Sequence, residues 1–149
     1  MVPMDPEAIH DVACALKQYV NMQDVPLCTF EEYDNFIAVA SEKVADVSTE
    51  QVARLKEVLA RLPPLHCRIM HMCVRFLQMV SSDEHRHLTC MNRTNCGIVF
   101  GPVFFRPMEF TAEYVFNVGK QCQLVEIMIA HADALFGPAA KETATATPA

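Results

Sequence analysis

The sequence predicts an all-α fold, a bundle of about six helices. Apolar residues recur at steps of three and four along most of the chain, which is the spacing of one face of a helix. Glycine occurs only 4 times in 149 residues, and no Asn-Gly or Asp-Gly pair separates two alternating stretches, so β-hairpins have little support. Hydrophobic residues make up 52% of the chain, which is enough to form a packed core.

The first predicted helix ends before Asp24-Val25-Pro26, because the residue before a proline avoids the α conformation. Lys17 lies off the apolar face of this helix, on a flank that it shares with Asn21. The apolar face itself is predicted to consist of Ile9, Val12, Ala13, Leu16, Tyr19 and Val20.

Two capping boxes predict the starts of the next two helices. Thr29 with Glu32 opens a helix whose apolar residues are Phe30, Tyr33, Phe36, Ile37 and Ala40. Ser48 with Gln51 repeats the pattern and precedes a second apolar series of Val52, Leu55, Val58 and Leu59.

A fourth helix is predicted from Leu65 to Val80, after the break at Pro63-Pro64. It is apolar on more than one side, which is typical of a central helix with several neighbours. The main stripe contains Leu65, Ile69, Met72, Cys73, Phe76 and Val80.

The second half of the chain is predicted to contain two more helices. After the polar connection SSDEHRH, one helix runs from Leu88 to Phe105, and Gly101-Pro102 must end or kink it. Thr111 is the predicted cap of a last helix that reaches about Phe136. We therefore expect a helical domain over residues 1–137 and a flexible C-terminal tail over 138–149, which has no core-forming residue.

Charge and hydropathy narrow the function classes. The net charge of −6 argues against nucleic acid and anionic membrane as main partners, because both need a cationic face. No apolar run is long enough to insert directly into a membrane, and the acidic start does not resemble a signal peptide, so we expect a cytoplasmic protein. The seven cysteines form no CxxC pair and fit reduced thiols, with Cys73 and Cys96 among the most buried.

Chemistry-bearing motifs are few. Cys67 and His71 are four residues apart on one helix face, but zinc needs three or four ligands, and core packing is the favoured interpretation. A metal- or cysteine-dependent enzyme rests on this pair alone. No G-x-S-x-G, H-E-x-x-H or glycine-rich phosphate loop occurs, so no active site, metal or cofactor is expected.

Asn95 stands out because it precedes the most apolar segment of the chain. On a helix it lies beside Met91 and Ile98, half-exposed between apolar neighbours. From spacing alone, a buried structural asparagine that bonds neighbouring backbone is the favoured interpretation, with a partner contact as the alternative.

Two ungapped motifs resemble the Rho GTPase-activating (RhoGAP) domain family. MNRTNCGIVFGPVFFRP is similar to the family pattern M-T-x-x-N-L-[AG]-x-[VI]-F-[GA]-P-x-[LF]-[LF]-R through Met91, Asn95, Gly97, Val99, Phe100, Gly101, Pro102 and Arg106. LKQYVNMQDVPL is similar to L-K-x-[FY]-[LV]-R-x-L-P-x-P-L through Leu16, Lys17, Tyr19, Val20, Pro26 and Leu27. With looser matches elsewhere, the resemblance covers Ala8 to Phe136.

The resemblance implies a RhoGAP-like regulatory module that binds a Rho-family small GTPase, rather than an enzyme with its own active site. In the family, the lysine and asparagine of these motifs lie on the surface that grips the GTPase, which favours a partner contact for Asn95. The implied GTPase-binding residues are Lys17, Asn21, Asn95 and Ile98, and we expect Lys17 and Asn95 to share one exposed face.

Two departures from the family pattern limit the expected activity. The family's catalytic arginine finger lies in a G-[IL]-[FY]-R motif before the lysine helix, whereas the first arginine here is Arg54. Asn21 also replaces an arginine of the second motif. Catalytic stimulation is therefore doubtful, and whether the chain is part of a longer domain or a natural relative without the finger stays open. The alternative function is a helical protein–protein interaction domain that kept the fold without GTPase binding.

Overall fold

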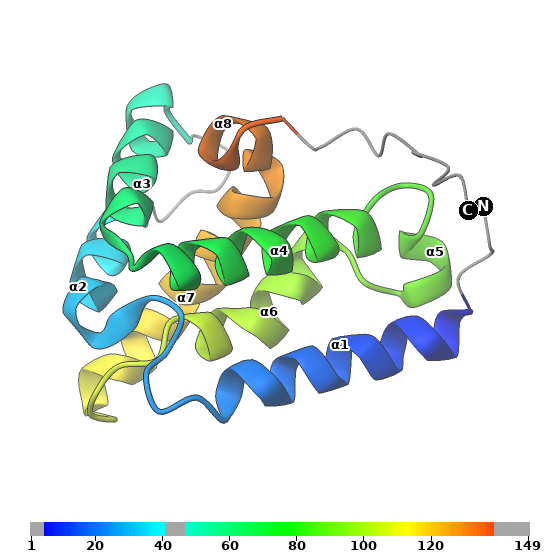
Figure 1. The fold of residues 1–149 in the computed structure, drawn as a ribbon, viewed down its shortest axis with the longest axis horizontal. Coiled ribbons are helices and arrows are strands. Elements are labelled where there is room, and N and C mark those ends of the chain that lie inside the picture. The colour runs from blue at the N-terminus through cyan, green and yellow to red at the C-terminus, as the bar shows by residue number, and fades with distance from the viewer. Residues whose placement is uncertain (1–4, 41–46, 139–149) are drawn as a thin grey trace, which may run out of the picture.

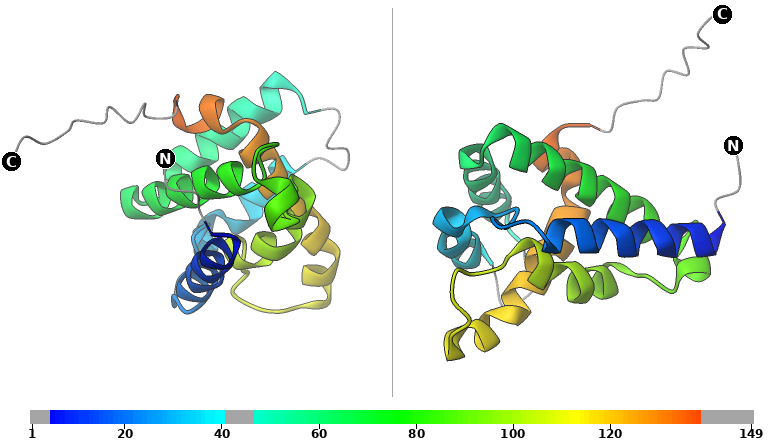
Figure 2. Two further views of the ribbon diagram at one scale, coloured as in Figure 1. Left: turned by 90° about the vertical axis from the view of Figure 1, so that its right-hand side faces the viewer. Right: turned by 60° about the horizontal axis from the view of Figure 1, so that its bottom comes forward.

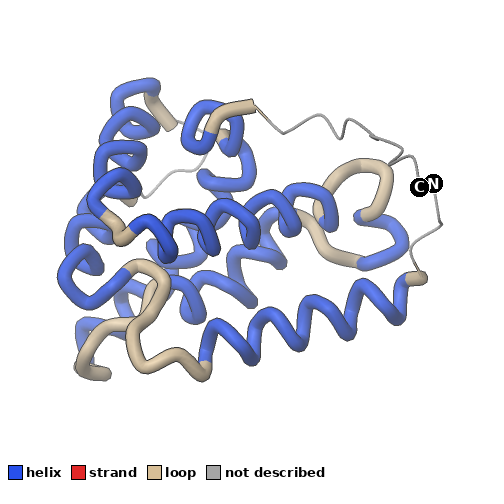
Figure 3. The backbone as a smooth tube through the Cα atoms, viewed as in Figure 1, coloured by secondary structure: helices blue, strands red, loops and turns tan. Residues whose placement is uncertain are grey.

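The computed structural model describes residues 5–40 and 47–138 (Figure 1). Within these ranges the chain forms eight helices and no strand, which confirms the all-α prediction (Figure 3). Two of the eight, α5 and α8, have only four and five residues. The helices are α1 (Pro6–Asn21), α2 (Thr29–Val39), α3 (Thr49–Arg61), α4 (Pro64–Val80), α5 (Arg86–Thr89), α6 (Arg93–Phe104), α7 (Ala112–Ala130) and α8 (Ala132–Phe136).

Helices α6 and α7 form the centre of the bundle. Figures 1 and 2 show α4 crossing over them, with α1 along one edge and α3 and α8 at the other. The core between these layers is aromatic and aliphatic. The chain supplies enough such residues, since 52% of its residues are hydrophobic. Its largest side chains with under 2% exposure include Phe36, Phe100, Phe104, Phe105, Leu124 and Met128.

Two glycines bring α6 against the backbone of α7. A Cβ atom built on Gly97 would lie 2.5 Å from the carbonyl oxygen of Cys122, and one on Gly101 would lie 2.7 Å from the Cys122 nitrogen. Both distances are shorter than any real Cβ contact. The sequence Gly97-x-x-x-Gly101 therefore sets both the spacing of the two central helices and the face that α6 turns towards α7.

The predicted helix starts are confirmed at the two capping boxes. Thr29 has φ +58°, outside the helical range, and its Oγ1 accepts a hydrogen bond from Glu32 N at 3.4 Å. Ser48 Oγ accepts from Gln51 N at 3.1 Å. Thr111 lies at the start of α7 as predicted, although its side chain makes no capping bond.

The helix predicted from Leu88 to Phe105 is wrong at its start. Cys90 adopts a left-handed conformation, φ +55°, which ends α5, and α6 begins only after Asn92. Gly101-Pro102 also fails to end the helix, which continues to Phe104. Pro102 has no N–H to donate to the carbonyl of Ile98, one turn earlier. This loss is tolerated because Ile98 is 59% exposed, so water can take the place of the missing donor.

Two predicted apolar faces are wrong in part. On α1, Val12 and Tyr19 are more than half exposed, and burial is restricted to Ile9 and Val20. On α4, Leu65 and Met72 are each 65% exposed. Helical spacing identified apolar residues correctly, but no neighbouring helix in the described ranges covers these four.

The last predicted helix differs from the prediction in one respect. His131 interrupts the predicted last helix, which becomes α7 and α8. The predicted flexible tail lies outside the described residues, except for Pro138.

All seven cysteines are described and unpaired, and Cys73 and Cys96 are buried as predicted, together with Cys28. Burial raises the pKa of Cys28 to about 12 and those of Cys73 and Cys96 to about 11, so these thiols stay protonated at neutral pH.

We predict that Gly101→Ala destabilises the protein by about 1–3 kcal/mol, because the added methyl group overpacks the contact with α7. Urea unfolding measures this change. Gly119→Ala is the matched control, since a Cβ at Gly119, inside α7, meets no atom within 4 Å. Alanine should stabilise that position by up to about 1 kcal/mol. Equal stability of both variants would contradict the close approach of α6 and α7.

Candidate functional site

Helix α1 supplies two of the predicted partner-binding residues. It begins after Asp5, whose Oδ1 accepts a hydrogen bond from Glu7 N at 3.1 Å, and Pro6 occupies the first turn. Lys17 and Asn21 follow one another at one helical turn, and both are exposed. Lys17 has no ion-pair partner within 4.0 Å among the described residues, so its ammonium group is available to a carboxylate from another molecule.

Helix α6 supplies the other two predicted partner-binding residues, Asn95 and Ile98. Asn92 caps the helix, because its Oδ1 accepts a hydrogen bond from Asn95 N at 2.8 Å. The side chain of Asn95 is half-buried, and its Nδ2 donates to the Cys90 carbonyl at 3.0 Å. This bond fixes the left-handed turn at Cys90, so Asn95 does have the structural role that its spacing favoured. Its side-chain oxygen has no hydrogen-bond partner in the described part of the chain and can accept one from a binding partner.

The orientation of α6 follows from its packing against α7. Because Gly97 and Gly101 face α7, the next position around the helix, Ile98, points outward and is 59% exposed. Asn95 lies about 60° further round the helix on the same outward side, towards Val99. Val99 lines a groove that Lys17 lines from α1. Asn95 itself does not line this groove, and its placement on one exposed face with Lys17 stays a prediction.

The groove between α1 and α6 has a volume of about 760 Å³. Its floor is apolar and comes from α4, α5, α6 and the segment that joins α5 to α6, through Phe76, Leu77, Val80, Leu88, Met91, Val99 and Phe100. Its rim on α1 is polar and of mixed charge, with Glu7 and Asp11 near the start of the helix and Lys17 towards its end. The positive end of this rim is therefore the end next to Asn21.

Arg106 joins the end of α1 to the end of α6. Its guanidinium donates to the backbone carbonyl groups of Asn21 at 3.3 Å, of Asp24 at 3.2 Å and of Gln23. The Asn21 carbonyl lies at the negative end of the α1 dipole, and the last turn of α1 contains no basic residue of its own. Arg106 therefore holds the segment with Lys17 and Asn21 against the helix with Asn95.

Sequence reasoning matched Arg106 to a motif but assigned it no role. Two signals pointed to one: a first helix without a basic residue in its last turn, and an arginine fixed between an apolar helix and Pro107. Spacing alone could not connect them, because 85 positions separate Arg106 from Asn21.

Cys67 and His71 have no further metal-ligating side chains grouped with them in the part of the chain that the structure describes. The His71 ring stacks on Phe136 with centroids 4.7 Å apart, and its Nε2 receives a hydrogen bond from Arg75 Nε at 3.3 Å. Within the described residues, no three histidine, cysteine, aspartate or glutamate side chains are grouped so as to hold a metal ion. In the same ranges, no helix has the length and apolar character needed to cross a bilayer.

Comparisons with known sequences give a consistent family. The RhoGAP domain model matches residues 2–109. N-chimaerin from Bos taurus is 37% identical over 131 residues, which is 87% of this chain and 38% of that protein. GTPase-activating protein CdGAPr from Drosophila melanogaster is 33% identical over 131 residues, 86% of this chain and 7% of that protein. The chain thus spans less than two fifths of the length of these relatives.

Solved structures share the fold. The BH domain from GRAF, the GTPase regulator associated with focal adhesion kinase, superposes with a TM-score of 0.75 at 23% identity, covering 93% of this chain and 70% of that one. Human Rho GTPase activating protein 15 gives a TM-score of 0.74 at 23% identity, covering 88% and 60%. At this identity the likeness concerns the helical architecture.

We predict that Arg106→Ala frees the end of α1, because three backbone carbonyls lose their charged donor. Amide hydrogen exchange in residues 18–25 should accelerate, and the free energy of unfolding should fall by about 1–3 kcal/mol. Arg106→Lys keeps the charge but not the planar fork of donors. Its exchange rates and its free energy of unfolding should therefore lie between those of the unmodified chain and those of Arg106→Ala. Unchanged exchange at the end of α1 in Arg106→Ala would show that the link is not needed.

Proposed function

The chain belongs to the RhoGAP domain family, and we propose that it binds a Rho-family small GTPase through the outward sides of α1 and α6. The observation that carries this proposal is the shared groove, which is lined by Lys17 of one family motif and by Val99 of the other. The two motifs are far apart in sequence, and the contact between α1 and α6 joins them.

Each of the four residues contributes a different contact. Lys17 provides an exposed positive charge for a carboxylate of the GTPase. Asn95 offers its free side-chain oxygen from a position fixed by the bond to Cys90. Ile98 adds an exposed apolar contact next to it, and Asn21 adds an exposed amide whose backbone is held by Arg106.

The arginines of the described ranges support weak stimulation of GTP hydrolysis. An arginine finger must present a fixed positive charge to the transferring phosphate. Arg54 belongs to α3, which Figure 1 shows on the far side of α4 from α1. Arg106 is committed to backbone carbonyls, which leaves Arg93 in the first turn of α6 as the exposed arginine nearest to Asn95. We propose that the chain acts as a GTPase-binding regulatory module with little activating power of its own.

We predict that Lys17→Ala weakens binding to a Rho-family GTPase by about 1–3 kcal/mol, which is the scale of a charge-assisted contact. Isothermal titration calorimetry with the GTPase bound to a non-hydrolysable GTP analogue measures the change. The fold should be unaffected, because Lys17 is exposed. Arg54→Ala on α3 removes an equal charge from another surface and should bind as the unmodified chain does. Equal binding of Lys17→Ala and the unmodified chain would refute the site.

We predict that the unmodified chain accelerates single-turnover GTP hydrolysis no more than about a thousandth as well as a relative that carries the finger, since an arginine finger supplies about 10³ to 10⁵ in rate. Hydrolysis by the GTPase is measured with and without saturating protein. Acceleration within tenfold of such a relative would mean that Arg93 or another arginine reaches the nucleotide, and Arg93→Ala would then abolish it.

A further inference from the structure

A second hollow lies away from the proposed GTPase-binding surface, between α3, the first half of α4 and α8. Its volume of about 610 Å³ is within the range of small-molecule sites. Figure 1 shows α3 and α8 on the opposite side of α4 from α1. The hollow has an apolar wall of Leu59, Leu62, Leu135 and Phe136, and its polar groups come from Lys56, Arg68 and His71.

The charge of this hollow differs from that of the whole chain. The chain has 18 acidic residues against 12 lysines and arginines, yet among the described residues no carboxylate lines the hollow. Lys56 and Arg68 both line it, and neither forms an ion pair within 4.0 Å in the ranges that the structure describes. By comparison, the groove at α1 contains Glu7 and Asp11. Two unneutralised cations facing one hollow favour an anion between them.

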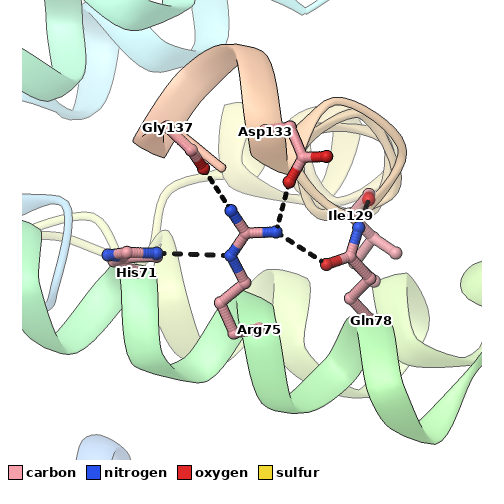
Figure 4. A network of polar contacts seen from close by, with 6 residues as sticks. All are labelled: His71, Arg75, Gln78, Ile129, Asp133 and Gly137. Atoms are coloured by element: carbon pink, nitrogen blue, oxygen red, sulfur yellow. Dashed lines mark hydrogen bonds and ion pairs between the residues drawn. The ribbon is translucent and has the colours of Figure 1, made fainter. Parts of the chain in front are cut away.

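Arg75 does not itself line the hollow but holds two residues that do, His71 and Gly137 (Figure 4). Its guanidinium binds Asp133 Oδ1 at 2.7 Å and the Gly137 carbonyl, so both its charge and that of Asp133 are neutralised. Its Nε–H donates to His71 Nε2. Burial and the nearby Arg75 charge lower the pKa of His71, so the ring is neutral at pH 7 and carries its proton on Nδ1.

This arrangement turns His71 into a fixed hydrogen-bond donor. The ring is held flat against Phe136, with an interplanar angle of 8°. Because Nε2 accepts from Arg75, the Nδ1–H points to the other edge of the ring and has no hydrogen-bond partner in the described chain. Pro64, the first residue of α4, also lines the hollow, so the positive end of the α4 dipole adds to the two cations.

We propose that this hollow is a binding site for a phosphate monoester with an apolar body. The phosphate group binds Lys56, Arg68 and the His71 Nδ1–H, and the apolar body packs on the wall that ends at Phe136. A soluble phosphorylated compound and a lipid headgroup share this chemistry. The proposal is independent of GTPase binding, because the hollow and the α1–α6 surface have no residue in common.

Phenyl phosphate is the probe that tests the site, with NMR titration of the complete chain. We expect saturable shifts in α3, α4 and α8, with a dissociation constant on the order of 1 mM. Lys56→Ala and Arg68→Ala should each weaken binding at least tenfold, while Arg54→Ala, also on α3 but outside the hollow, should not. All three side chains are exposed, so thermal unfolding without ligand should be the same for each variant.

Vesicles separate the two sources of the phosphate. Co-sedimentation with phosphatidic acid vesicles, but not with phosphatidylcholine vesicles, and its loss in Arg68→Ala would assign the site to a lipid headgroup. Binding of phenyl phosphate without co-sedimentation would assign it to a soluble compound. Failure of both probes, or equal weakening in Arg54→Ala and Arg68→Ala, would overturn the proposal.

Discussion

The contact between α6 and α7 at Gly97 and Gly101 determines how the rest of the structure is arranged. Without side chains at these two positions, α6 lies directly on the backbone at Cys122, which fixes its distance and its rotation. Phe100 and Phe104 then point into the core, and Ile98 points outward. The rotation of α6 is therefore set by the absence of side chains at Gly97 and Gly101, and the bond to Cys90 then fixes the side chain of Asn95.

Arg106 links the central helix α6 to α1 at the edge of the bundle. It lies two residues after the end of α6 and binds carbonyls at and just beyond the end of α1, so the position of α6 also sets the position of the helix that carries Lys17. Arg75 has a similar function on the other side, where it ties α8 to α4. In both cases one planar guanidinium satisfies several acceptors from another segment, which lysine cannot reproduce.

The sequence predicted the helices better than it predicted their surroundings. Capping boxes at Thr29 and Ser48 depend on neighbouring residues only, and both predicted starts are confirmed. The left-handed turn at Cys90 was missed, because it depends on a bond from Asn95 that forms only once α6 exists. Exposure of Tyr19 could not be predicted either, since helical spacing shows which residues share a face but not whether another helix covers it.

The candidate site was accessible from the sequence only in part. Spacing favoured a structural Asn95, and its bond to Cys90 confirms that role, while the resemblance added the partner contact. The hollow at Arg68 could not be foreseen, because it joins three helices whose packing no local pattern specifies. Local chemistry thus predicts elements, whereas sites depend on contacts between distant segments.

We propose that α1 and α6 present one surface to a Rho-family GTPase. NMR of the complete chain, with and without the GTPase bound to a non-hydrolysable GTP analogue, tests it most directly. We predict that the NMR signals of the Ile98 methyl groups and of the side-chain amides of Asn21 and Asn95 shift together on binding. Shifts confined to α3, α4 and α8, with these three groups unchanged, would contradict it.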